Sequence, residues 1–142
     1  MKAAGLVEYQ HALALAVAHG GGAVPSVDRR GVALFGDMAF RKRLAALRAL
    51  LPNTVAALGR AAFEERYRAF AAERMPCGAD GYRDEAVAFA RSLGMPVARR
   101  EARIVAAHGP RRTFAIVRDG RRIAVFVRFR DGSRLHVVQL GR

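Results

Sequence analysis

The hydrophobic period of this sequence changes at Pro96, and that change constrains the fold more than any other feature. Before Pro96, apolar residues recur every three or four positions, as in amphipathic helices. After it, dipeptides Asp119-Gly120 and Asp131-Gly132 separate runs of β-branched and aromatic residues, which is typical of β-hairpins. The sequence therefore predicts an α+β protein with a four- to five-helix bundle over residues 1–96. A small basic antiparallel β-meander of three to four strands, over residues 97–142, packs on or beside it.

Capping residues and helix breakers divide the helical part. The expected helices are residues 5–19, a helix that Ser26 or Asp28 caps and Pro52 ends, a short helix from Pro52 to Gly59, a helix that Met75-Pro76 ends, and a helix from Asp80 or Asp84 to Gly94. Apolar residues at helical spacing predict that one face of each helix is buried. The clearest of these are Leu44, Leu47, Leu51, Phe63, Tyr67, Phe70, Ala86 and Ala90.

The alternation beyond Pro96 assigns side chains to two faces of the sheet. The expected strands are residues 113–118, 121–130 and 133–140, with residues 102–106 as the candidate fourth. One face gathers Phe114, Ile116, Ile123, Val125, Val127, Phe129, Val138 and Leu140, and the other gathers Ala115, Val117, Phe126, Leu135 and Val137 with Arg122, Arg128 and Arg130. Because the first face is the more apolar, we expect it to pack on the helices.

Positive charge is concentrated in the same segment. The chain has 25 basic and 12 acidic residues, a formal net charge of +13. Residues 97–142 hold twelve arginines and three carboxylates, and so supply +9 of that charge. A localised positive surface favours a negatively charged partner, either a nucleic acid or an acidic peptide or protein.

Arginines beside an aromatic ring suggest a candidate nucleic-acid site. A strand face with Phe126 between basic residues could stack a base and hold phosphates, as single-strand platforms do. The candidate binding residues are Arg111, Arg112, Arg122, Phe126, Arg128 and Arg130, with Arg41, Lys42 and Arg43 on a helix as a second group. The alternative interpretation is an ordinary half-buried strand and a solvated helix face, each carrying arginines that bind nothing.

No constellation of residues predicts catalysis. The four histidines are scattered, without carboxylates or thiols at ligand spacing, and no histidine lies near Cys77 in the sequence. We therefore expect no catalytic residues, no metal and no cofactor, and a protein that is not an enzyme. A single cysteine and the lack of an apolar run of membrane-spanning length favour a soluble cytoplasmic protein, whereas Lys2 followed by Ala12–Ala18 leaves secretion as the alternative.

The order of several helix boundaries resembles a known family. It runs through Gln10-His11-Ala12, Lys42-Arg43, Leu47, Leu51-Pro52, Leu58-Gly59, Phe63, Tyr67, Phe70, Pro76 and Phe89, over about residues 6–94. This order is similar to that of helical modules, named for DNA binding, at the N-terminus of bacterial accessory proteins encoded beside multinuclear non-haem iron oxidases that modify peptides. The resemblance implies a non-catalytic helical module that binds DNA or presents a substrate peptide to an oxidase.

Two functions follow as expectations. In the first, the arginine-rich meander binds nucleic-acid phosphates, and the affinity depends steeply on salt. In the second, the protein is an accessory partner whose exposed sheet edge adds a strand from an acidic peptide. The sequence leaves the oligomeric state open.

Overall fold

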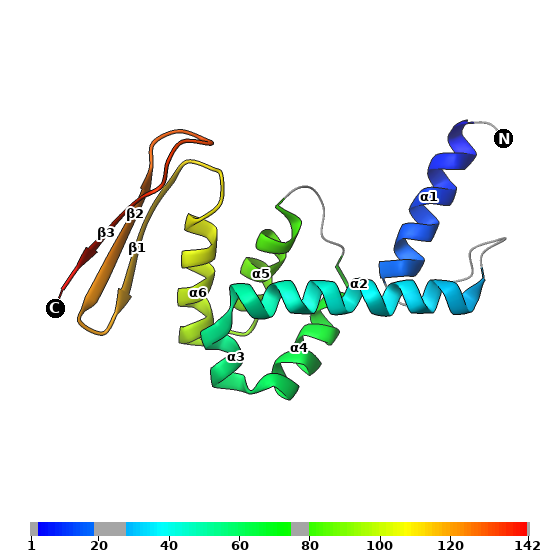
Figure 1. Ribbon diagram of the computed structural model, residues 1–142, viewed down its shortest axis with the longest axis horizontal. Coiled ribbons are helices and arrows are strands. Elements are labelled where there is room, and N and C mark those ends of the chain that lie inside the picture. Colours follow the sequence, from blue (N-terminus) through cyan, green and yellow to red (C-terminus); the bar gives the residue numbers. More distant parts are fainter. Residues whose placement is uncertain (1–2, 19–27, 75–79, 142) are drawn as a thin grey trace. The chain divides into compact units, whose positions relative to one another are not determined.

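The computed structural model describes residues 3–18, 28–74 and 80–141 of this α+β protein (Figure 1). The elements are α1 (Ala3–Ala18), α2 (Arg29–Leu50), α3 (Pro52–Leu58), α4 (Arg60–Ala72), α5 (Gly81–Ser92), α6 (Pro96–Ala107), β1 (Thr113–Asp119), β2 (Arg122–Arg128) and β3 (His136–Leu140). Ser26, Cys77 and the Met75-Pro76 helix end lie outside the described residues. The expected fold class is confirmed.

Local signals place the ends of the helices where the sequence predicts them. The carboxylate of Asp28 accepts the backbone N–H groups of Arg30 and Gly31, at 3.1 and 3.2 Å, and so caps α2. Pro52 is the first residue of α3, where its missing N–H costs no hydrogen bond. Gly59 ends α3 with φ of 81°, a backbone angle that favours glycine.

Helix α6 corrects the expectation for the residues after Pro96. The proposal of a strand over residues 102–106 is wrong, because these residues are helical. Pro96 both follows the end of α5 and opens a new helix, since proline suits the first helical turn. Ala98, Ala102 and Val105 are buried at helical spacing, with arginines between them. Three of the twelve C-terminal arginines, Arg99, Arg100 and Arg103, therefore lie on a helix.

Two compact units make up the chain, and none of the three boundaries between them falls at Pro96. The first comprises Met1–Ala46 and Glu64–Met75, and the second comprises Leu47–Phe63 and Pro76–Arg142. In the first unit, Ala16 and Val32 pack together between α1 and α2. The rings of Phe40 and Tyr67 stack there with their centroids 5.6 Å apart.

The second unit is organised around α6. Helices α3 and α5 and strand β1 all contact this helix, and α6 lies between α5 and the sheet (Figure 1). Leu47, Leu51, Phe63 and Phe89 are almost completely buried, and the last two rings meet edge to face at 5.2 Å. These buried residues, together with Ala98 and Ala102 of α6, supply the apolar interior of the second unit.

A buried carboxylate joins α6 to α3. Glu101 of α6 is 3% exposed, and its two oxygens accept four hydrogen bonds from the first turn of α3. The backbone N–H groups of Asn53 and Thr54 donate at 2.7 and 2.8 Å, and their side chains donate at 2.9 and 2.6 Å. A carboxylate there satisfies amides with no partner inside the helix and faces the positive end of the helix dipole.

The sheet is antiparallel in the order β1-β2-β3. Asp119 pairs with Arg122, so that Gly120 and Arg121 form the tight turn, one residue later than expected. The second Asp-Gly is not a two-residue turn, because residues 129–135 form a longer loop between β2 and β3. The carboxylate of Asp131 accepts the N–H of Arg112 instead, which ties this loop to the segment before β1.

The sheet packs on α6 through the face that the sequence analysis assigned to solvent. The register confirms the grouping of side chains into two faces, but the prediction of which face is buried is wrong. Val117 and Phe126 are buried against Ala107, with Ala115 and Ala124 beside them. Small side chains let a helix approach a sheet closely, whereas a count of apolar residues alone favours the opposite, bulkier face.

We expect removal of the Glu101 carboxylate to destabilise the protein by about 2–4 kcal/mol, because buried donors of α3 would lose their acceptor. The variants are Glu101→Ala and Glu101→Gln, and the latter should lose less because its amide oxygen still accepts. Urea unfolding followed by circular dichroism measures the change. The control is Glu65→Ala on the exposed side of α4. An equal, small effect of both alanine variants would contradict the role assigned to Glu101.

Candidate nucleic-acid interface

The face of the sheet turned away from α6 is apolar, and no described element of the second unit packs on it. We call it the outer face, and its three rows across the strands are Phe114, Val127 and His136; Ile116, Val125 and Val138; Arg118, Ile123 and Leu140. Seven of these nine side chains are apolar and none is acidic. The outer face thus offers an apolar surface with positive charge at one corner.

The largest side chains of this surface are well exposed. Phe114 is 73% exposed, and Ile116, Val138 and Leu140 are each about half exposed. Three strands about 4.8 Å apart and about five residues long give, with their side chains, a patch on the order of 300 Å². Exposed apolar patches of this size on a monomer often mark a binding surface.

Aromatic rings gather at one end of the outer face. Phe114 and His136 occupy the two edges of the same row. Phe129, just beyond β2, is 71% exposed, and its ring meets that of His136 edge to face at 6.1 Å. Three exposed rings therefore lie across roughly 10 Å of the sheet, the width of two strand spacings.

Arginines surround that same end, which we call the loop end. It consists of the α6–β1 loop with Arg111 and Arg112 and the β2–β3 loop with Arg130 and Arg134, all four exposed. The N–H of Gly132 donates to the carbonyl of Pro110 at 2.7 Å, in addition to the Arg112–Asp131 hydrogen bond. The two loops are therefore held together, and the one acidic residue there already accepts a backbone N–H.

Phe126 does not serve as the expected base platform. It is 5% exposed, and its ring packs edge to face on His108 at 5.5 Å. Arg128 is half-buried and donates to the carbonyl of Ser133, so it holds the β2–β3 loop rather than facing solvent. Arg122 lies at the opposite end of the sheet from Arg130. The candidate residues therefore do not form one cluster, and the prediction that Phe126 stacks on a base is wrong.

The second expected group, on α2, also separates. Arg41 pairs with Asp37 at 2.8 Å on the surface, and Lys42 is exposed. Arg43 is 4% exposed, donates to the carbonyl of Arg74 at 3.1 Å and lies over the ring of Tyr67. Arg43 therefore has a structural role in the first unit, and the expectation that it contacts a phosphate is wrong.

The sequence analysis missed Phe114, Phe129 and His136 as site residues. It placed both phenylalanines on the face expected to be buried, and it treated His136 only as a possible ligand. The signal that could have found them is the distribution of alanine, because Ala115 and Ala124 mark the face that a helix can approach closely.

Other kinds of site are not indicated within residues 3–18, 28–74 and 80–141. There, no group of three or more His, Cys, Asp or Glu side chains could hold a metal ion. No helix in this part of the chain has the length and apolar character to cross a membrane.

Comparison with protein-family models, with curated proteins and with solved structures finds no match.

Two phenylalanines of the same sheet test the corrected orientation. We expect Phe126→Ala to lower the free energy of unfolding by about 3 kcal/mol, since it leaves a cavity against α6. Phe114→Ala should change it by less than about 0.5 kcal/mol, because the ring contacts mainly solvent. Urea denaturation of both variants makes the comparison. The reverse order of effects would mean that the outer face is the buried one.

Proposed function

We propose that this protein is a non-catalytic module that binds single-stranded nucleic acid on the outer face of its sheet. The observation that carries the proposal is the meeting of exposed aromatic rings with exposed arginines at the loop end. Phe114, Phe129 and His136 offer surfaces on which bases can stack, and the four loop-end arginines can contact phosphates. The net charge of +13 supports an anionic partner.

A single strand suits this surface better than a duplex. The bases of a duplex are stacked on one another and present only their edges, whereas unpaired bases expose the faces that an aromatic ring contacts. A sheet with two or three aromatic side chains on its open face is a common platform for unpaired bases. The apolar rows behind the rings would exclude water from stacked bases.

The two kinds of contact have different signatures. Stacking contributes roughly 1–3 kcal/mol per base and depends little on salt. Each phosphate contact steepens the fall of log affinity with log salt by about 0.7 for a single strand. Variants of the rings should therefore lower affinity at all salt concentrations, and variants of the arginines should also flatten the salt dependence.

The experiment is fluorescence-anisotropy binding to a random single strand and a random duplex, at low and near-physiological salt. We expect binding of the single strand to persist at near-physiological salt and to exceed that of the duplex. Phe114→Ser with Phe129→Ser should weaken it roughly tenfold or more, with little change in salt slope. Arg111→Ser with Arg130→Ser should reduce both affinity and slope.

Arg66→Ser with Arg91→Ser is the matched control, because both arginines are exposed on helices and the charge change is the same. It should leave the single-strand affinity within about threefold of the parent, by general electrostatics alone. If the ring variants bind as tightly as the parent protein, stacking on the outer face does not occur and the proposal fails.

A second candidate function rests on the edge of the sheet. All five residues of β3 are exposed, and β3 forms one edge of the sheet among the described residues. An acidic peptide could add a strand there, with neighbouring arginines supplying complementary charge, as an accessory protein for a peptide-modifying oxidase would require.

The same assay separates the two candidates. An extended acidic peptide should bind tightly at near-physiological salt if the edge of β3 is the site, and nucleic acid should then bind only at low salt. The Phe114→Ser, Phe129→Ser variant should bind that peptide as the parent does, because backbone hydrogen bonds dominate strand addition. Loss of peptide binding in this variant would speak against the edge.

A further inference from the structure

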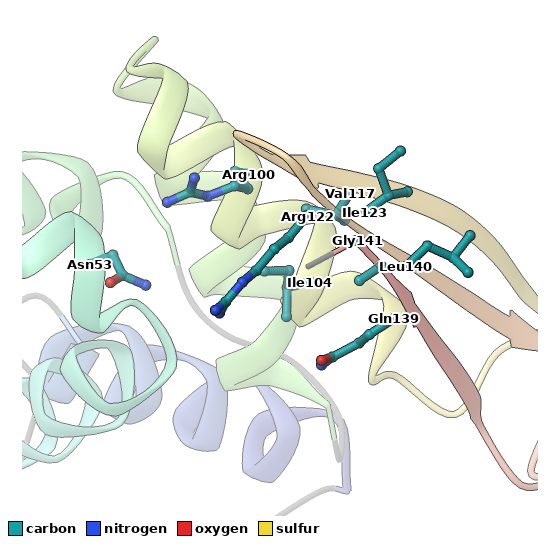
Figure 2. A pocket seen from close by; sticks show the side chains of 10 residues that line it. Asn53, Arg100, Ile104, Val117, Arg122, Ile123, Gln139, Leu140 and Gly141 are labelled. Carbon is teal, nitrogen blue, oxygen red and sulfur yellow. The ribbon is translucent and has the colours of Figure 1, made fainter.

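A cleft opens beside the sheet at the end opposite the loop end. It lies between α6, the start of α3, the first residues of β2 and the last residues of β3, and its volume is about 500 Å³ (Figure 2). Sites for small molecules usually enclose about 300–1,000 Å³. All of its described lining belongs to the second compact unit.

Two arginines line this cleft from different elements. Arg122, the first residue of β2, extends away from the sheet toward the helix that carries Asn53 (Figure 2). Arg100 of α6 also lines the cleft. None of the described lining side chains is a carboxylate. The neighbouring Glu101 is committed to the first turn of α3, at 2.7 and 2.8 Å from two backbone nitrogens.

The remaining lining suits a planar organic group. Ile104, Val117 and Ala124 contribute apolar surface, and Gln139 and Asn53 contribute carboxamides. The amide nitrogen of Asn53 donates to Glu101 at 2.9 Å, which fixes the orientation of that side chain. A pair of arginines suits a dianionic phosphate, because each planar guanidinium can donate two parallel hydrogen bonds to phosphate oxygens.

We propose that the cleft binds a phosphate monoester of the size of a mononucleotide. Arg122 and Arg100 contact the phosphate, and Gln139 contacts the polar edge of the base. The monoester can come from a free mononucleotide or from the terminal phosphate of a bound strand. The second source rests on the proposed function, because Ile123 and Leu140 of the outer face adjoin the cleft at the same end of β2 and β3.

The test measures binding of adenosine 5′-monophosphate and inorganic phosphate by calorimetry. It also measures binding of one oligonucleotide with a 5′-phosphate, a 3′-phosphate or neither. Arg122→Gln should weaken mononucleotide binding roughly tenfold or more, because it removes a charged hydrogen-bond donor. The control is Arg121→Gln, because Arg121 directly precedes Arg122 and does not line the cleft. It should change the affinity for the mononucleotide by no more than about twofold.

A second variant adds charge instead of removing it. Gln139→Glu places a carboxylate of the same shape in the cleft and should abolish mononucleotide binding by repulsion. Gln139 is exposed on the edge strand, so the substitution leaves the core intact. Its circular dichroism spectrum should match that of the parent protein.

The outcomes separate this inference from the proposed function. Binding of the mononucleotide without binding of any strand supports the cleft and overturns the single-strand proposal. Strand binding that a terminal phosphate strengthens, with the gain lost in Arg122→Gln, supports both. Strand binding that ignores the terminal phosphate, together with no binding of the mononucleotide, overturns the cleft inference alone. Mononucleotide binding that is equal in Arg122→Gln and Arg121→Gln overturns it as well.

Discussion

The carboxylate of Glu101 is the interaction on which the second compact unit depends. It joins the middle of α6 to the first turn of α3 by four hydrogen bonds and leaves almost none of its surface to water. A buried ion is costly to desolvate, and here the polar end of a helix offsets that cost. Because α6 also contacts α5 and β1, this contact and the packing of Val117 and Phe126 on Ala107 together position the outer face.

Much of the fold could be predicted from local signals. The cap at Asp28, the break at Pro52, the turn at Gly59 and the first Asp-Gly hairpin each depend on residues close together in sequence. Such signals act through backbone geometry, which the sequence displays directly. The helix after Pro96 was missed because one proline serves both as the end of one helix and as the start of the next.

The orientation of the sheet could not be predicted, because it is decided by long-range packing. Both faces alternate correctly and both contain apolar residues, so the pattern leaves the choice open. Close approach to Ala107 selects the face with alanines, and Phe126 fills the space that remains. The same choice moves the candidate site, since it buries the ring that the sequence suggested and exposes Phe114. Exposed apolar residues that do not pack on any described helix form the kind of patch that often binds a partner.

The position of the arginines has a consequence for solubility. An uncovered apolar sheet would tend to pair with a second copy, and two outer faces brought together would also bring together two sets of loop-end arginines and two copies of Arg118. Repulsion between these like charges opposes self-association while their field attracts an anionic ligand to the same surface. Positive charge around the sheet thus keeps the outer face from pairing with a second copy. An anionic ligand would neutralise this charge and, by covering the outer face, would also keep a second copy away.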